Sequence, residues 1–430
     1  MQTGNKRTIS DFLNTEFRQY ALYTVHGRAL PTLLDGFKPV HKKIMWTARR
    51  KAANKPVKTV SLSGYVIADA DYKHGDASAI DSIVNMAAPW RNNLNLLEGL
   101  GNFGWRMVPE AGAPRYTKVQ LHDNFNRWFS DFNALDFVPG DDGAFYEPVC
   151  YYANVPWFFV NGFRGIATGY SCFCHPRDPQ KLAQLMLDLL DGKVPCTSSL
   201  DISYPEYDGI IADGMSMGAV KKISQKKMAI CSLPVEYTIE SYAKYLSNLI
   251  DKGIIRDFHK TVAEGQPPFV VDLKGPLANP IKSLGLSRKL TGETLTFIHD
   301  GHLVEFDTPW DAVGLFVQER LKIAGKGLQA AKTSNQDLQS RIQTKIRFVE
   351  LLTERGLEGL TRQDLRKIIV GLDRPDMADT LLSMAASKMT EDSIGKWTDQ
   401  IMNLSEDLSV LNSVNPSIWL KYNILNQPSS

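Results

Sequence analysis

The sequence predicts a multi-domain protein of mixed α/β class that continues into a long helical arm. Its 430 residues, of which 43% are hydrophobic and 22% charged, are enough for two or three globular domains. Between about 145 and 305, short apolar segments are separated by Gly, Pro and Asp, which is typical of strands joined by turns. After residue 308, apolar or small residues recur at steps of three and four, which is typical of a long helix.

The first part of the chain combines predicted helices with a block of positive charge. A helix is predicted over 11–33, and a second over 39–52, because proline favours a first helical position. No acidic residue occurs between Gly36 and Ala68, and the basic residues there are Lys38, Lys42, Lys43, Arg49, Arg50, Lys51, Lys55 and Lys58. A solvated helix face would normally mix charges, so this block favours a phosphate-binding surface.

The arm begins at a recognisable helix start. Thr308 is a predicted N-cap, followed by proline at the first helical position. The apolar seam continues to 352, which corresponds to a helix of roughly 60 Å. A second seam, from Ile394 to Leu411, predicts a returning helix, and 353–390 reads as short helices between the two. An ordinary helical bundle is the alternative, and Gly325 and Gly327 weaken the long helix by about 1 kcal/mol each relative to alanine.

Composition excludes several other classes of protein. Lysine plus arginine (49) nearly balances aspartate plus glutamate (47), so total charge favours no partner. The five cysteines lack paired spacing, and neither Asp69-Ala-Asp71 nor Cys172-Phe-Cys-His175 has the further ligands of a metal site, so we predict none. Without a leader or a long apolar run, we expect a soluble cytoplasmic protein.

A glycine motif at 99–104 matches the dinucleotide-binding pattern GxGxxG. The residues after it, WRMVPEAGAPR, contain two prolines and a glycine where a phosphate-binding helix would have to begin. We therefore do not expect this motif to bind a dinucleotide.

The dipeptide Arg115-Tyr116 is the strongest candidate for chemistry. A tyrosine hydroxyl, with an ordinary pKa near 10, is a poor nucleophile at neutral pH unless cations lie close to it. Arg115 precedes it in sequence, and folding could bring the basic block, Lys73 and His74 nearby. Such a set suits attack on a phosphodiester, because cations neutralise the phosphate oxygens and a histidine can relay a proton. The resulting phosphotyrosyl ester is close in energy to the bond that was broken, so the cleavage is reversible.

Five stretches of sequence make the chain similar to a known family: GRALPTLLDGFKPVHKK (27–43), YKHGDASAIDSIVNMAAP (72–89), EGLGNFGW (98–105), PRYTKVQL (114–121) and NGFRGIATGY (161–170). In this order they resemble the DNA breakage-reunion subunits of type IIA topoisomerases, the class that includes the gyrase A protein. They span the first 170 residues, and the rest of the chain matches mainly in architecture. The chain ends without a DNA-wrapping domain, and its length is similar to that of the subunits from T-even-type bacteriophages.

The resemblance implies a domain organisation. A winged-helix cleavage domain is expected over 1–145 and an α/β tower over 146–307. An antiparallel coiled-coil arm is expected over 308–352 and 391–430, with a helical dimerisation gate over 353–390 at its tip.

The resemblance also implies roles for individual residues. Tyr116 corresponds to the DNA-linking tyrosine, and Arg115 to the arginine that steadies the scissile phosphate. Residues expected to line the cleavage site and contact phosphate are Arg28, Lys38, His41 and His74. Further DNA contacts are expected from Lys42, Lys43, Arg49, Arg50 and Lys73.

The implied partners are double-stranded DNA, a second copy of the chain, and an ATPase/Toprim subunit that binds both Mg²⁺ and ATP. If the chain is phage-encoded, the host cytoplasm is its expected location. No membrane partner is expected.

The sequence departs from the family pattern at two places that matter here. Tyr72-Lys-His-Gly-Asp76 is one residue shorter than the family's Tyr-His-Pro-His-Gly-Asp, so Lys73 replaces a histidine as a phosphate contact. Where many members carry an isoleucine that wedges between base pairs, the alignment falls on Cys174, with Phe173 beside it. Either could act as the wedge, and Phe173 is favoured, since unstacking needs an apolar group of some bulk.

These features predict a DNA-cleaving and rejoining subunit of an ATP-dependent type II topoisomerase that is active only with its partner. The main alternative is a non-enzymatic winged-helix DNA-binding protein that dimerises through a coiled coil. A weaker one is a gyrase A or topoisomerase IV core that lacks its C-terminal domain. Only Arg115-Tyr116 and its supporting cations separate the first two, because a pure binding protein has no use for that tyrosine.

Overall fold

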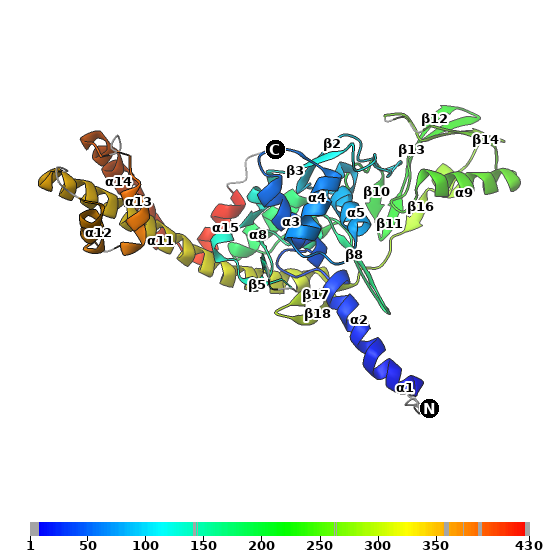
Figure 1. Ribbon diagram of the computed structural model, residues 1–430. Helices are drawn as coiled ribbons and strands as arrows, with labels where there is room; N and C mark the ends of the chain where they lie inside the picture. Colours follow the sequence, from blue (N-terminus) through cyan, green and yellow to red (C-terminus); the bar gives the residue numbers. More distant parts are fainter. Residues whose placement is uncertain are drawn as a thin grey trace, which may run out of the picture. The chain divides into compact units, whose positions relative to one another are not determined.

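The computed structural model describes residues 8–140, 143, 145–261, 263, 265–356, 361–372, 374–385 and 389–425 (Figure 1). Gly359, which belongs to the predicted short helices of 353–390, lies outside these residues. The chain divides into two compact units. Unit 1 comprises 1–130, 135–320 and 423–430, and unit 2 comprises 131–134 and 321–422. The helices and antiparallel sheets confirm the predicted mixed α/β class.

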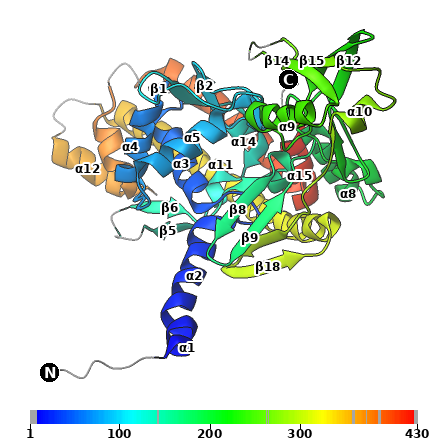
Figure 2. The ribbon, with the colours of Figure 1, turned by 90° about the vertical axis from the view of Figure 1, so that its right-hand side faces the viewer.

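Unit 1 begins with a continuous helical segment (Figure 2). Its parts are α1 (Ile9–Phe12), a π-helical segment (Leu13–Phe17), α2 (Arg18–Thr24) and a second π-helical segment (Val25–Ala29). The predicted helix over 11–33 therefore ends four residues early. Leu30 is extended (φ −87°, ψ 134°) because the following proline disfavours helical geometry at the residue before it.

Helices α3 to α5 pack on one another beside a small sheet. The helices are α3 (Pro39–Lys51), α4 (Thr59–Asp69) and α5 (Asp76–Ala87). The antiparallel sheet has the order β1-β3-β2, from Val57–Lys58, Lys118–Leu121 and Leu97–Leu100. Helix α3 begins at Pro39 as predicted. Helix α5 begins after Gly75, whose φ of +83° favours glycine at this tight entry.

The GxGxxG segment is a loop. Strand β2 ends at Leu100, Gly101 and Gly104 have positive φ, and the next regular element along this fully described stretch is β3. No helix begins there to receive a pyrophosphate, in agreement with the expectation from its sequence.

Short elements connect this region to the strand-rich part of unit 1. They are α6 (Asn124–Trp128), β4 (Phe129–Ser130), a 3-10 turn (Phe132–Ala134, in unit 2), β5 (Phe137–Pro139), β6 (Tyr146–Pro148), β7 (Tyr152–Ala153), α7 (Trp157–Val160), β8 (Phe163–Ala167), β9 (Tyr170–Cys174) and α8 (Pro179–Leu190). Strands β4 and β7, β5 and β6, and β8 and β9 form antiparallel pairs.

The strand-rich part of unit 1 confirms the short strands joined by turns that were predicted for 145–305. One sheet has the order β10-β11-β16 (Ile210–Ala212, Met215–Met217, Ser287–Lys289). Another has the order β12-β13-β15-β14 (Ala219–Ser224, Lys227–Ser232, Phe269–Leu273, Ile255–Lys260). Helix α9 (Ile239–Asp251) contributes Tyr242 and Leu246 to the same buried core as Phe269 of the second sheet. Short helix α10 (Pro280–Ser283) precedes β16.

The hairpin of β17 (Leu295–His299) and β18 (His302–Phe306) leads into the long helix α11 (Pro309–Arg355). The Thr308 hydroxyl accepts a hydrogen bond from Asp311 N–H at 3.3 Å, so the predicted N-cap is confirmed. At 47 residues the helix is about 70 Å long. Arg320, which is fully buried in unit 1, donates to the carbonyl of Ala153 at 2.9 Å.

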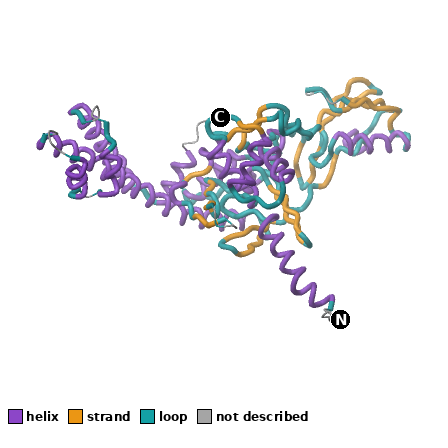
Figure 3. The backbone as a smooth tube through the Cα atoms, viewed as in Figure 1, coloured by secondary structure: helices purple, strands orange, loops and turns teal. Residues whose placement is uncertain are grey.

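The described elements of unit 2 are helical (Figure 3). Beyond α11 they are α12 (Arg362–Val370), a 3-10 turn (Pro375–Met377), α13 (Ala378–Leu382), α14 (Glu391–Ser413) and α15 (Pro416–Leu425). Phe348 and Leu352 of α11 share a buried core with Ile369 of α12. Helix α14 contains the returning helix predicted from Ile394 to Leu411, and a separate helix, α15, begins at Pro416.

Gly327 is required by packing within unit 2. A Cβ at this position would overlap the Asp131 carboxylate and lie 2.8 Å from Asp131 Cβ. Asp131 has little room to move, because its carboxylate accepts a hydrogen bond from Trp419 Nε1 at 2.7 Å. The close approach explains a glycine that helix propensity alone counts as a defect.

We therefore expect Gly327→Ala to lower the free energy of unfolding by about 1 to 3 kcal/mol, the usual cost of overpacking, even though alanine favours a helix. Denaturant unfolding followed by circular dichroism measures this. Gly314→Ala is the matched control, since nothing lies within 4 Å of a Cβ at Gly314 of the same helix, and it is expected to stabilise by up to about 1 kcal/mol. Equal gains in both variants would contradict the packing argument.

Candidate functional site

Tyr116 lies on a turn that leads into β3, with its side chain 76% exposed. Its N–H donates to Ala113 O at 2.8 Å, and the Arg115 guanidinium carbon lies 4.8 Å from the centre of its ring. It is therefore not a core aromatic. Its hydroxyl can be reached by a large substrate, and a cation lies directly beside the ring.

The turn is held by the beginning of α4. Thr59 N–H donates to Thr117 O at 3.0 Å, and Val60 N–H donates to Pro114 O at 3.2 Å. The hydroxyls of Thr59 and Thr117 are 2.8 Å apart and buried. These bonds fix the backbone on both sides of Tyr116 while its side chain stays in solvent.

A cleft of about 1180 Å³ gathers most of the other predicted residues. Those that line it are Arg28, Lys38, His41, Lys43, Lys73, His74, Phe173 and Cys174. Arg91, Arg106 and Arg164, which the sequence pattern did not single out, line it as well. Arg115 and Tyr116 are not among the lining residues, so a single chain presents the tyrosine turn and the basic cleft as separate features.

His74 lies immediately before Gly75, the N-cap of α5. Its ring lies edge-on to Tyr72 with 5.3 Å between centroids, and Tyr72 is itself fixed by a 2.8 Å contact between its hydroxyl and that of Ser78. Nδ1 of His74 is hydrogen-bonded to Arg28. An arginine can only donate, so Nδ1 accepts and a neutral ring carries its proton on Nε2. Nε2–H is thus a donor that an anion in the cleft can use.

Lys38 and His41 lie at the start of α3. The Lys38 ammonium donates to the carbonyl of Arg164. Burial lowers the pKa of Lys38, and positive charge on Arg91 lowers it further. Burial, with Lys38 and Arg91, lowers the pKa of His41 to about 3. His41 is therefore neutral at pH 7 in the absence of an anion.

Two lysines of the basic block form ion pairs that its sequence does not show. Lys43 is already paired with Glu147 at 2.7 Å and donates to Ala70 O at 2.7 Å, so its charge is balanced within the chain, and its role in DNA binding stays a prediction. Lys51 pairs with Asp69 at 2.9 Å. Both carboxylates come from outside the acid-free stretch, which is why the sequence did not show them.

Two other cations of the block are hydrogen-bonded to main-chain carbonyls. Lys42 donates to Val149 O at 2.8 Å. Arg50 donates to Asp69 O at 3.2 Å and lies over Trp46, 4.8 Å from its ring. Arg49 is half-buried. Because main-chain carbonyls do not neutralise a cation, Lys42 and Arg50 remain available to attract phosphate.

Cys174 is wrong as a DNA wedge. It is 1% exposed, and its thiol contacts the carbonyl of Phe158 at 3.6 Å. Phe173 is half-buried between Arg164, at 5.5 Å from its ring centre, and His175, at 4.6 Å between centroids. Both residues lie at the end of β9 that is held by the rest of unit 1.

The sequence pattern did not identify Ile166, which is 74% exposed on β8. Figure 2 shows β8 and β9 side by side as a ribbon. Gly165 sets which face is buried, because a Cβ there would overlap the carbonyl oxygen of Ala29. Alternation along the strand then turns Ile166 outward. The alternation of residues along the strand is visible in the sequence. Which of the alternating residues face solvent is not, because that depends on the close contact of Gly165 with the backbone at Ala29.

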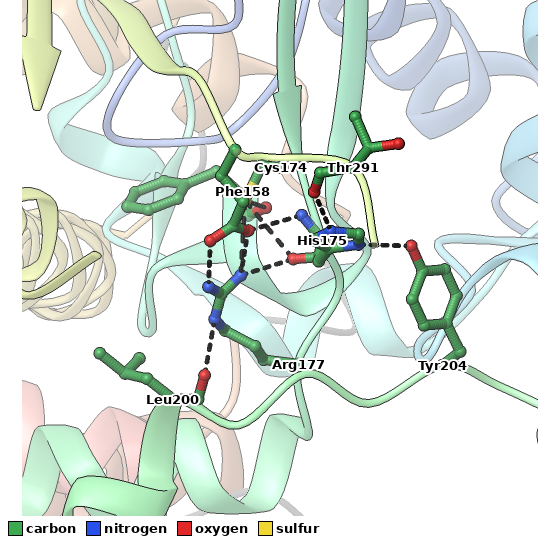
Figure 4. Close-up of polar contacts among 8 residues, drawn as sticks. Phe158, Cys174, His175, Arg177, Leu200, Tyr204 and Thr291 are labelled. Atoms are coloured by element: carbon green, nitrogen blue, oxygen red, sulfur yellow. Dashed lines mark hydrogen bonds and ion pairs between the residues drawn. The ribbon is translucent and has the colours of Figure 1, made fainter. Parts of the chain in front are cut away.

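A buried polar network lies behind this end of β9 (Figure 4). Arg177, only 2% exposed, donates to both carboxylate oxygens of Glu293, at 2.9 and 2.7 Å. It also donates to His175 O at 2.7 Å and Leu200 O at 3.0 Å. Burial alone raises the pKa of Glu293, but hydrogen bonds and charge from Arg177 outweigh it and lower the pKa.

His175 has a structural role in the same network. Nε2 lies 2.8 Å from Thr291 O, and Nδ1 lies 2.6 Å from the Tyr204 hydroxyl. A carbonyl can only accept, so Nε2 carries the proton and Nδ1 accepts from tyrosine. Burial lowers the pKa of His175, which keeps the ring neutral. The network ties β9 to the segment before β17.

Two kinds of feature are absent from the described residues. No helix among them combines the length and the apolar character needed to cross a membrane. Within the same residues, no group of three or more His, Cys, Asp and Glu side chains is placed to hold a metal ion.

Comparison with known proteins gives consistent matches. The family model for the A-type subunits of DNA gyrase and topoisomerase IV matches residues 28–426. The DNA topoisomerase medium subunit of Enterobacteria phage T4 is 29% identical over 425 residues, which cover 94% of this chain and 95% of that protein. The mitochondrial DNA topoisomerase 2 of Dictyostelium discoideum is 26% identical over 96% of this chain, and human DNA topoisomerase 2-alpha is 27% identical over 78%.

The chain spans 34% of the Dictyostelium protein and 24% of the human one. Among solved structures, the DNA-binding, cleavage and re-ligation domain of Plasmodium falciparum topoisomerase II matches with a TM-score of 0.86 and 22% identity. That match covers 97% of this chain and 64% of the other, and it establishes a shared fold.

Proposed function

The chain belongs to the family of A-type subunits of DNA gyrase and topoisomerase IV, and we propose that it is the DNA-cleaving and rejoining subunit of an ATP-dependent type II DNA topoisomerase. The observation that carries the proposal is the exposed Tyr116 beside Arg115, on a turn whose backbone is fixed at both ends. A protein that only bound DNA would have no use for a nucleophile presented in this way.

The chemistry follows from the proposed roles. The hydroxyl oxygen of Tyr116 forms a bond to a backbone phosphorus, and the bond from that phosphorus to the 3′ oxygen breaks. The phenol proton passes to solvent and the departing 3′ oxygen takes up a proton, so the 5′ end stays linked to tyrosine. Arg115 stabilises the negative charge on the phosphoryl oxygens. The reverse reaction rejoins the strand, and one such break in each strand opens a gate for a second duplex.

The basic cleft supports a role in holding DNA beside the break. Arg28 and the Nε2–H of His74 are donors for phosphate oxygens, and Lys38 adds positive charge at the start of α3. Lys73 lies next to His74, pairs with Asp71 at 3.3 Å and is 52% exposed, so its ammonium can also meet a phosphate. Lys42, Arg49 and Arg50 extend the positive surface.

The proposed architecture follows the family. Helices α3 to α5 with sheet β1-β3-β2 would form a winged-helix domain within 1–145, with α5 entering a DNA groove. Residues 146–307 would form the tower. An antiparallel coiled-coil arm would comprise 308–352 and 391–430, and 353–390 would form the dimerisation gate. The long α11 and the helical core around Phe348 support this division.

The proposed assembly is a homodimer that works with an ATPase/Toprim partner in the host cytoplasm. Mg²⁺ and ATP would both be bound by that partner. The phage T4 relative, which this chain matches over nearly its full length, is itself named as one subunit of a topoisomerase.

Ile166 replaces Phe173 and Cys174 as the proposed DNA wedge. We expect Ile166→Ala to reduce DNA bending substantially and to lower cleavage by about tenfold, because unstacking a base step needs an apolar group of some bulk. Bending is measured by energy transfer between the ends of a labelled duplex. Ile223→Ala, which removes another exposed isoleucine on β12, is the matched control. An unchanged bend with Ile166→Ala would contradict this assignment.

The test of the function mixes the chain with its ATPase/Toprim partner, Mg²⁺ and supercoiled plasmid, and then adds denaturant. We expect linear plasmid that carries this chain on its 5′ ends. DNA binding without any covalent product, with a partner shown to be folded, would reject the cleavage function.

A further inference from the structure

Three cations from separate parts of unit 1 face the same cleft. Arg91 ends the short 3-10 turn after α5, Arg164 lies on the exposed face of β8, and Lys38 precedes α3. The Lys38 ammonium is bound to the main-chain carbonyl of Arg164, so Lys38 is held against the strand that carries Arg164. Neither Arg91 nor Arg164 belongs to the positions that the resemblance assigned to the cleavage site.

Each acidic residue that lines the cleft has a partner other than Arg91 and Arg164. They are Asp71, Glu147 and Glu236. Asp71 pairs with Lys73, and Glu147 pairs with Lys43. The Glu236 carboxylate accepts a hydrogen bond from the Thr291 hydroxyl at 2.6 Å. Across the described residues, no ion pair involves Arg91 or Arg164, so their charges are not neutralised by protein.

The cations also act on one another. Burial lowers the pKa of Arg91, and the charge of Arg164 lowers it further. Arg91 in turn contributes to the lowered pKa of Lys38 and of His41. Like charges held together in a partly desolvated place cost free energy unless an anion joins them. The cluster is therefore arranged for a ligand of negative charge.

We infer that Arg91, Arg164 and Lys38 form a second phosphate-binding position, which holds a backbone phosphate of the duplex away from the phosphate that Tyr116 attacks. Planar guanidinium groups bind phosphate through paired N–H donors, which suits two arginines on opposite elements. This inference rests on the proposed function, because the phosphate belongs to the DNA that is cleaved. It adds two arginines that fix the path of the duplex.

The test measures binding of a fluorescent duplex to the full chain alone, by anisotropy, over a range of KCl concentrations. The slope of log K against log salt reports the number of phosphates neutralised. Arg91→Gln and Arg164→Gln are each expected to reduce the magnitude of the slope by up to about 1, and the double variant by about 1, because the slope counts phosphates and the two arginines share one phosphate. Arg91→Lys should keep the slope but weaken binding, because charge is kept and the paired donors are lost.

Arg347→Gln is the matched control. It removes one positive charge from α11, where Arg347 pairs with Glu350 at 3.7 Å, and it should leave the slope unchanged. Wild-type slopes in both Arg91→Gln and Arg164→Gln would overturn the inference and leave the cleavage function intact. Failure of the wild-type chain to bind duplex DNA at all would reject both. Circular dichroism establishes that each variant is folded, as expected for cleft-lining side chains without ion pairs.

Discussion

Tyr116→Phe is expected to abolish covalent attachment of the chain to DNA, by at least about 10⁴-fold, a loss typical of removing a nucleophile. The variant lacks one oxygen atom. Because the ring is exposed and lies beside Arg115, the turn and the ring contact are expected to be unchanged. DNA binding should stay within about twofold, since binding depends mainly on contacts with the phosphate backbone.

The measurement is the amount of protein-linked linear plasmid after denaturation, in the presence of the partner and Mg²⁺. Tyr146→Phe is the matched control, because Tyr146 on β6 is also exposed and lacks a neighbouring arginine in sequence. It should cleave like wild type. If Tyr116→Phe still forms the adduct, the nucleophile is another residue.

Arg177→Met is expected to lower the free energy of unfolding of unit 1 by about 3 kcal/mol, the lower end of the range for breaking a buried ion pair. The substitution leaves the Glu293 carboxylate without its partner and removes the donors to His175 O and Leu200 O. The lower end applies because Glu293 is still 17% exposed. Methionine keeps most of the volume over Phe159, whose ring centre is 4.0 Å from the guanidinium carbon.

Urea unfolding monitored by tryptophan fluorescence measures this loss. The double variant Arg177→Met with Glu293→Gln should recover part of it, because no unpaired charge remains. Lys181→Met is a suitable control, since the exposed pair of Lys181 with Asp201 at 3.8 Å should contribute less than about 1 kcal/mol. A loss below about 1 kcal/mol in Arg177→Met would contradict the importance of the network.

The same pair predicts a dependence on pH. Arg177 holds the folded-state pKa of Glu293 below its ordinary value of 4.5. Its contribution to stability is therefore fully present above about pH 4.5 and is lost as the pH falls through the lowered folded-state pKa. In Arg177→Met, burial without the arginine raises that pKa. The variant should therefore lose less stability than the wild type as the pH falls from 7 to 3. Thermal unfolding between pH 3 and 7 would reveal the difference.

Local signals in the sequence determined the class of fold, the helix starts at Pro39 and Pro309, and Tyr116 as the candidate nucleophile. These features depend on residues a few positions apart: a proline that sets one dihedral angle, a threonine that caps one turn, an arginine beside a tyrosine. The five stretches of family resemblance added the expected roles of Arg28, Lys38, His41 and His74. For the same reason, the sequence showed that no helix follows the glycine motif at 99–104.

Only the tertiary structure decided which of these side chains are available. Lys43 is neutralised by Glu147, 104 positions away, and Arg177 by Glu293, 116 positions away. Burial excludes Cys174 as a wedge and leaves Ile166 exposed, because β8 packs through Gly165 against the backbone at Ala29. Charge pairing and burial are set by contacts between segments distant in sequence, so a pattern read along the chain identifies the candidate residues but not their partners.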